Sequence, residues 1–129
     1  MVTSFSCSVI NDRLTEIAVV TNVEMDHHSH WGSERELRAA FAELTAKAKR
    51  VARPEDVDLE PELAVPGQHN LLNARAALAA ARLAGFDVDR AAEALASFPG
   101  VHRRLELKGS RDGIPVYDDY GHHPTEVRA

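Results

Sequence analysis

Acidic, aromatic and imidazole side chains crowd into one stretch of this chain, residues 118–126, which includes Asp119, His122 and His123. Carboxylates and imidazoles together can hold a cation, accept a proton or bind the polar groups of a nucleotide. The stretch directly follows residues 114–117, an apolar segment typical of a short strand. Loops after strands are where open α/β folds place ligand chemistry. The stretch is therefore a candidate binding site, although its residue types also suit an ordinary polar turn rich in histidine.

A second cluster of candidate ligands consists of Asp26, His27, His28 and His30, in a polar loop after another predicted strand. Neutral imidazole is a common metal ligand, and a neighbouring carboxylate can fix its tautomer. The alternative is a solvated loop whose histidines bind nothing, or bind only adventitious transition metal. The residue types alone leave both interpretations open.

Amide and imidazole side chains gather at the predicted start of an alanine-rich helix, at His69, Asn70 and Asn73. An amide can pair with both the donor and the acceptor edge of a purine, and an imidazole can stack on its ring. Asn70 is equally suited to be the N-cap of that helix, with Asn73 a surface residue of its first turn. One role does not exclude the other.

Arg104 and Asp119 form the last candidate pair. A guanidinium can neutralise charge on the oxygens of a transferring phosphate. A carboxylate can accept hydrogen bonds from ribose hydroxyls or help to hold a cation-bound nucleotide. The alternative is a surface ion pair on a hairpin, which would contribute little.

Four segments in this order resemble the Mur ligases, the ATP-dependent amino-acid ligases of peptidoglycan synthesis: residues 18–27, 67–77, 98–106 and 118–126. The resemblance covers most of the chain from about Glu16 onward. The pair Arg103 and Arg104, together with the last segment, most resembles the branch that joins L-alanine to UDP-N-acetylmuramate. The resemblance implies ATP and Mg²⁺ as cofactors, UDP-N-acetylmuramate and L-alanine as substrates of the full-length enzymes, and a cytoplasmic location.

The resemblance also implies roles for individual residues. His27 matches a histidine near the active-site magnesium. The residues that match nucleotide-binding positions are His69, Asn70, Asn73, Arg104 and Asp119. Two of these, Arg104 and Asp119, are also the residues expected to take part in catalysis.

Parts of the family pattern are missing. No Gly-Lys-Thr phosphate loop occurs, residues 1–15 hold no counterpart of the magnesium-binding glutamate motif, and Ser29 stands where the family usually has an acid. We therefore expect a fragment or truncated relative of the ligase that is not catalytically competent alone. The alternative is a non-catalytic α/β module that binds nucleotide weakly or self-associates, as a homodimer formed through an open sheet edge.

The order of apolar patterns predicts a small layered α/β fold with short strands and about three helices. The expected strands are 16–22, 63–65, 105–108 and 114–117, the last two forming a hairpin. The expected helices begin at Ser33, with a capping box to Glu36, at Asn70, and at Asp87 or Asp89. Residues 1–100 are expected to resemble part of a Mur central domain, shortened near 51–66, and residues 101–129 the hairpin and start of the C-terminal domain.

Composition excludes several function classes. The 129 residues are 44% hydrophobic, 27% charged and only 5% aromatic, so one small domain, or parts of two, must pack mainly through Ala, Leu and Val. A net charge of −5 argues against nucleic-acid binding and against a polybasic membrane anchor. No apolar run approaches the length of a membrane span. The single cysteine, Cys7, excludes an internal disulfide.

Overall fold

A computed structural model describes residues 15–25, 31–122 and 124–128 of the chain. Its elements are β1 (Ile17–Val19), α1 (Glu34–Lys47), β2 (Arg50–Ala52), the 3₁₀ turn η1 (Pro54–Asp56), α2 (Gln68–Leu83), α3 (Val88–Leu95), β3 (Glu106–Arg111), β4 (Ile114–Asp118) and α4 (Pro124–Arg128). The α/β class expected from the sequence is confirmed. Among the described residues, no helix is long and apolar enough to cross a membrane.

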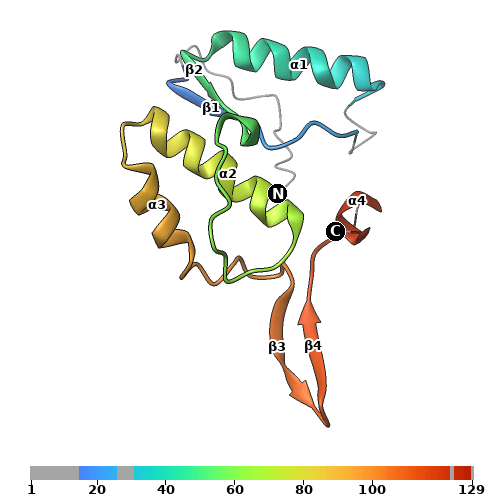
Figure 1. The fold of residues 1–129 in the computed structure, drawn as a ribbon. Helices are drawn as coiled ribbons and strands as arrows, with labels where there is room; N and C mark the ends of the chain where they lie inside the picture. The colour runs from blue at the N-terminus through green and yellow to red at the C-terminus, as the bar shows by residue number, and fades with distance from the viewer. Residues whose placement is uncertain (1–14, 26–30, 123, 129) are drawn as a thin grey trace.

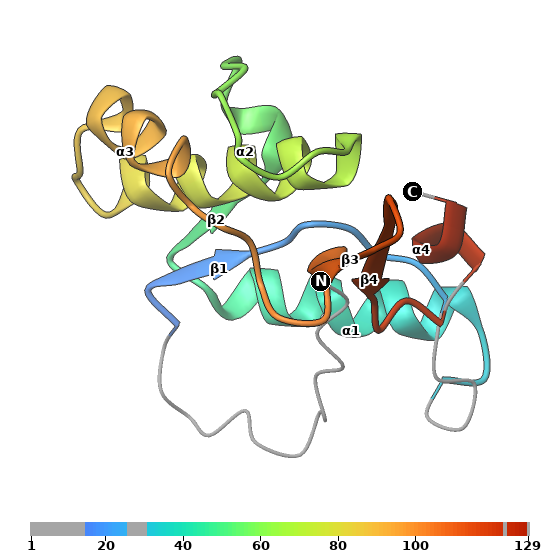
Figure 2. The same cartoon turned by 90° about the horizontal axis from the view of Figure 1, so that it is seen from below.

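The body of the molecule is a three-layer arrangement around a two-stranded sheet. β1 and β2 are parallel, with Ala18 opposite Val51, and α1 connects them. Figures 1 and 2 show α1 on one side of this sheet and α2 with α3 on the other. Covering both faces is typical of parallel strands, because a helical crossover must pack back onto the sheet.

The core lies between the sheet and α2. It consists of Ala52, Val57, Leu78 and Ala79, all at most 3% exposed. The apolar face expected for the third helix is confirmed, since all its members pack against this cluster: Val88, Ala91, Ala92 and Leu95. Leu78 is the largest fully buried side chain among the described residues. The core is therefore small and rich in alanine, so α2 approaches the strands closely.

The first helix begins as its sequence predicts. Ser33 is the N-cap of α1, and its side chain accepts a hydrogen bond from the backbone N–H of Glu36. The Glu36 carboxylate accepts from the N–H of Gly32 rather than from Ser33, so the reciprocal bond of the box is shifted by one residue. One of the four unsatisfied N–H groups of this terminus, that of Glu36, is thereby paired, and so is the N–H of Gly32 just before the cap.

The start of α2 differs from the prediction in two ways. The expected strand at 63–65 is wrong, since these residues are in a loop without a paired strand. The N-cap is Gly67 rather than Asn70, which lies inside the first turn and donates from its amide to the carbonyl oxygen of Pro66 over 2.6 Å. Gly67 has a φ angle of +106°, a backbone conformation that residues with a side chain rarely adopt. With Gly67 as its N-cap, the helix begins about one turn earlier than it would with Asn70 as the cap.

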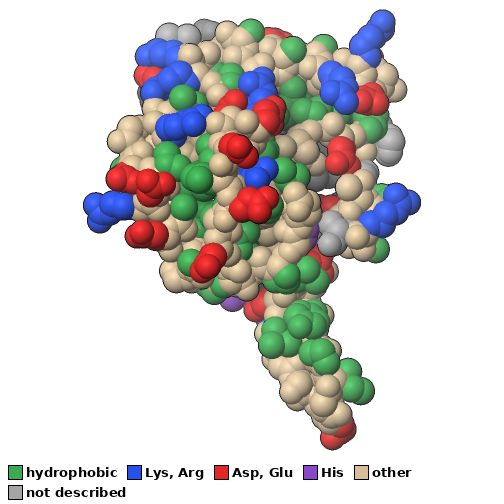
Figure 3. Space-filling view, in the orientation of Figure 1, with side chains coloured by type: hydrophobic (Ala, Val, Ile, Leu, Met, Phe, Trp, Pro, Cys, Tyr) green, Lys and Arg blue, Asp and Glu red, His purple; other side chains and the backbone are tan. Residues whose placement is uncertain are grey.

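The hairpin of β3 and β4 follows the prediction. Its turn, Asp112-Gly113, has φ angles of +53° and +79°, the pattern of a two-residue type I′ turn whose twist suits an antiparallel pair. The hairpin projects from the body as an arm (Figure 1). Apolar side chains are exposed along it, including Leu107, Ile114 and Val116 at 52–67% exposure, and they form the patch at its base and middle in Figure 3.

Candidate functional site

The base of the hairpin is held together by the Asp119 carboxylate. Its Oδ2 accepts the backbone N–H of Leu105 over 2.7 Å, and its Oδ1 accepts the N–H of Gly121. These two bonds join the turn before β3 to the loop after β4. They stabilise the ionised carboxyl, and so the pKa of Asp119 is lowered, first by the Gly121 amide and then by the Leu105 amide. Asp119 is thus a structural anchor in the unliganded chain.

The turn before β3 is strained, and Glu106 holds it. Arg103 and Leu105 have φ angles of +60° and +46°, which cost energy for residues that carry a side chain. The Glu106 carboxylate accepts the backbone N–H of Arg103 over 2.9 Å and also contacts His102 and Lys108. The Arg103 amide, followed by the His102 and Lys108 side chains, lowers the pKa of Glu106 to about 2.

This strained turn presents two arginines to one aromatic ring. The guanidinium carbon of Arg103 lies 4.8 Å from the centre of the Tyr120 ring, and that of Arg104 lies 6.0 Å from it. His122 packs against the ring edge-on, with ring centres 5.2 Å apart. The backbone N–H of Tyr120 donates to the Arg103 carbonyl oxygen over 2.9 Å, which fixes the ring relative to the turn. Cations over an aromatic face are attracted by its quadrupole.

Arg104 is also paired with a carboxylate. Its Nη1 lies 3.3 Å from Oε1 of Glu126, with the two side chains 32% and 17% exposed. The other oxygen of Glu126 accepts the backbone N–H of His122 over 3.2 Å. The guanidinium further lowers the pKa of Asp119, as a smaller contribution than the two backbone amides. Arg104 therefore lies between two negative charges.

The start of α2 faces the same place. His69 makes one of the smaller contributions that lower the Asp119 pKa. In the described part of the chain, Nδ1 of His69 is the buried side-chain atom without a hydrogen-bond partner. Asn70 lies in the same turn and Asn73 one turn further along, both half-buried. Pro66, which precedes this helix start, lines one hollow together with Arg104 of the hairpin base.

A hollow of about 700 Å³ opens beside this cluster. One wall is the apolar segment Ala64, Val65 and Pro66, which leads into α2. The opposite wall comes from residues 99–107 and includes Arg104. Apolar walls with a few charged groups are typical of small-molecule sites, and the size suits a nucleoside.

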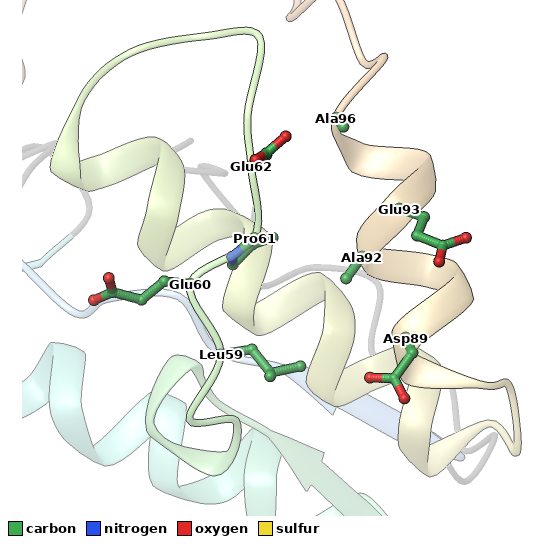
Figure 4. Close-up of a pocket in the computed structure, with 8 residues that line it drawn as sticks. All are labelled: Leu59, Glu60, Pro61, Glu62, Asp89, Ala92, Glu93 and Ala96. Carbon is green, nitrogen blue, oxygen red and sulfur yellow. The ribbon is translucent and has the colours of Figure 1, made fainter.

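A second, shallower hollow carries no comparable arrangement. It measures about 430 Å³ and lies between the loop at 59–62 and α3. Figure 4 shows that its four carboxylates do not converge, since those of Glu60 and Glu93 point in opposite directions. Within the described ranges, no group of three or more His, Cys, Asp or Glu residues could hold a metal ion.

Some predicted site residues fall outside the described part of the chain. His27, the expected metal-site residue, lies outside the described residues, as do His28 and His30. Sequence reasoning missed two residues that organise the site: Glu106 and Glu126. Glu126 lay within the 118–126 segment, but only the ion pair with Arg104 reveals what it contacts.

Comparison with known proteins identifies relatives of one kind. The UDP-N-acetylmuramate–L-alanine ligase of Paenarthrobacter aurescens is 38% identical over 162 residues, covering 88% of this chain and 36% of the relative. The ligase of the same name from Mycolicibacterium vanbaalenii is 54% identical over 84 residues, covering 65% of this chain and 18% of the relative. No protein-family model matches the chain.

A solved structure agrees with these sequence matches. The UDP-N-acetylmuramate-alanine ligase MurC of Thermotoga maritima superimposes with a TM-score of 0.72 at 29% identity, covering 88% of this chain and 36% of that one. The chain thus spans about a third of the length of such relatives. Within that span it is shortened, because 88% of 129 residues is about 114, whereas the Paenarthrobacter match extends over 162. In sequence and fold, the chain belongs to the Mur ligase family.

Proposed function

We propose that this chain retains the base end of an adenine-nucleotide site and does not catalyse amino-acid ligation alone. The observation that carries the proposal is the hollow of about 700 Å³, whose lining joins Pro66, directly before the α2 start, to Arg104 at the hairpin base. The lowered pKa of Asp119, to which Arg104 and His69 make small contributions, supports it. The relatives are UDP-N-acetylmuramate–L-alanine ligases, so the reaction from which this chain's site would derive is the joining of L-alanine to UDP-N-acetylmuramate.

The residues present fit the nucleoside end of ATP. The Asn70 amide donates to Pro66, which orients the side chain and leaves its oxygen as an acceptor for a purine amino group. Asn73 would add a second amide, and the His69 ring an imidazole with an unpartnered nitrogen. Asp119 would accept from ribose hydroxyls through the lone pairs that its two backbone donors leave open.

The phosphate end fits poorly. The sequence has no Gly-Lys-Thr loop whose amides and lysine would surround the phosphates. Arg104 is the one predicted phosphate contact, and it is paired with Glu126. Among the described residues no metal-binding cluster exists, so no step through Mg²⁺ is assigned to them. Bound Mg²⁺ would neutralise phosphate charge, as metal ions do in phosphoryl transfer. ATP and Mg²⁺, with a cytoplasmic location, remain part of the proposal through the family.

The domain division belongs to the same proposal. Residues 1–100 would correspond to part of a Mur central domain, and residues 101–129 to the hairpin and start of a C-terminal domain. The arm-like position of β3 and β4 supports a boundary near residue 100 (Figure 1). The nucleotide would then contact both parts, as ligands often do at a junction between domains.

Titration with adenosine, ADP and ATP tests the proposal. Binding should be weak, with Kd of roughly 1 mM, or about 4 kcal/mol, because only the base end is held. Backbone NMR shifts should change near Asn70 and Asp119 for all three ligands. Asn70→Ala should remove them, whereas Gln68→Ala, exposed in the same turn, should not. Unchanged shifts near Asn70 at 10 mM adenosine, on the order of ten times that Kd, would reject the nucleotide site.

A ligation assay tests the other half. Incubating the chain with ATP, Mg²⁺, UDP-N-acetylmuramate and L-alanine should release no phosphate above background. Phosphate release that requires both UDP-N-acetylmuramate and L-alanine would show a complete active site and overturn the proposal.

A second candidate function is self-association as a homodimer. The observation that favours it is the exposure of apolar side chains along a hairpin whose two edges have no neighbouring strand in the described chain. Pro115 opposes pairing through β4, since it removes one donor from that strand. Pairing would therefore use β3. Light scattering at rising concentration should give a dimer mass, and a monomer mass at about 1 mM chain, far above typical dimer dissociation constants, would exclude this candidate.

A further inference from the structure

The Arg104–Glu126 pair occupies the guanidinium that a phosphate group would need. We propose that Glu126 competes with phosphate oxygens for Arg104, so that this carboxylate lowers the affinity of the site for phosphorylated ligands. The inference rests on the proposed nucleotide site. It assigns Glu126 as a specificity-determining residue that acts through Arg104 and does not itself touch the ligand.

Geometry shows why the competition is direct. Glu126 Oε1 lies 3.3 Å from Arg104 Nη1, and Oε2 accepts the backbone N–H of His122, so both carboxylate oxygens are engaged. A phosphate oxygen would seek the same N–H groups of the guanidinium, which favours planar, two-point recognition of carboxylate or phosphate. Both anions cannot hold the same edge of Arg104 at once.

Electrostatics makes the competition costly for the ligand. Arg104 already faces two carboxylates, since it lowers the pKa of Asp119 and is paired with Glu126. The side chain of Glu126 is only 17% exposed, so solvent screens its charge less than that of a fully exposed residue. An incoming phosphate therefore meets two carboxylates around Arg104 unless Glu126 moves away. That movement would break the bond from the backbone N–H of His122.

Replacing the carboxylate by its neutral isostere tests this. Glu126→Gln keeps the shape and one acceptor for the His122 amide but removes the competing charge. We expect the affinity for ADP and for inorganic tripolyphosphate to rise by roughly two- to fivefold, the range that corresponds to removing one partly exposed ion pair. Adenosine, which carries no phosphate, should bind wild type and variant equally. In wild type, ADP should shift the amides of His122 and Val127, and adenosine should not.

Matched variants separate the explanations. Glu93→Gln removes the same charge from an exposed position on α3 and should leave ADP affinity unchanged, which controls for net charge. In an Arg104→Gln background, adding Glu126→Gln should give no gain in affinity. Glu126→Asp, which shortens the reach, should reproduce part of the gain if the fold is intact by circular dichroism.

The outcomes distinguish the inference from the proposed function. If adenosine does not bind, while tripolyphosphate binds Glu126→Gln more tightly than wild type, the adenine site is rejected and the competition between Glu126 and phosphate is supported. Weaker or equal binding of tripolyphosphate and ADP to a folded Glu126→Gln protein would overturn the inference. So would an equal gain in Glu93→Gln, or no tripolyphosphate binding to any variant.

Discussion

Leu78→Ala should lower the free energy of unfolding by about 3 kcal/mol, in the lower half of the range for substitutions that create a cavity at a buried leucine. Leu78 is 1% exposed and is the largest member of a core otherwise built from Ala52, Val57 and Ala79. One neighbour, Val57, follows the short turn η1, which can move toward the space that the smaller side chain leaves. We therefore expect a loss below the upper limit of that range. For a domain whose total stability is about 5–15 kcal/mol, this is a large fraction.

Urea denaturation followed by circular dichroism at 222 nm would measure this loss, on the order of a few kcal/mol. Leu72→Ala is the matched control, because Leu72 lies on the same helix but is 40% exposed. It should cost less than about 1 kcal/mol. Equal losses for the two variants, or a loss below about 1 kcal/mol for Leu78→Ala, would refute the assignment of the core to the α2–sheet interface.

Three further predictions concern the hairpin base and the first helix. Asp119→Asn should destabilise by about 1–2 kcal/mol, because the amide has one acceptor oxygen where the carboxylate has two, so one of the two backbone N–H groups loses its acceptor and the Leu105 amide should exchange faster with solvent. The pKa of Glu106 falls from 4.5 to about 2 in the folded chain, so its stabilisation is present above pH 4.5 and is lost as the pH falls toward 2. A pH titration of the Arg103 amide shift should therefore have its midpoint near 2, and a midpoint near 4.5 would contradict this. Ser33→Ala should cost about 1 kcal/mol in a thermal melt, through loss of the N-cap bond.

Local chemistry accounts for the elements that were predicted correctly. Ser33 begins α1, Asp87 caps α3, and the Asp-Gly pair forms the hairpin turn, because each of these residues acts on its own neighbours in the chain. The apolar face of α3 was predictable for the same reason, since helical periodicity determines which side chains share a face.

The errors arose where distant parts of the chain decide. β2 pairs with β1 across a whole helix, and a three-residue strand carries too little pattern to reveal this. The segment 63–65 is apolar but has no strand beside it, so it stays a loop that lines the larger hollow. Asn70 has the right residue type for a cap, yet Gly67 begins the helix.

The local roles of the candidate site residues could not be predicted from the motifs. Arg104 and His69 each make a small contribution to the lowered pKa of Asp119. The anchoring role of Asp119 depends on two backbone amides from segments that meet only after folding. The positive φ angles of Arg103 and Leu105 are equally hidden, since neither residue type favours them.

The comparisons also indicate where the chain is shorter than its relatives. The Mycolicibacterium match extends over 84 residues and covers 65% of the chain, which is also 84 residues, so it contains no residues that this chain lacks. A continuous stretch of 84 residues within 129 begins no later than residue 46 and ends no earlier than residue 84, so it always includes residues 46–84. The additional residues of the longer match therefore lie outside 46–84, and so outside the interval near 51–66 to which the sequence pattern points. Residues 46–84 contain the end of α1, the strand β2 and the whole of α2. The stretch that leads from β2 into the candidate site therefore has an uninterrupted counterpart in that relative.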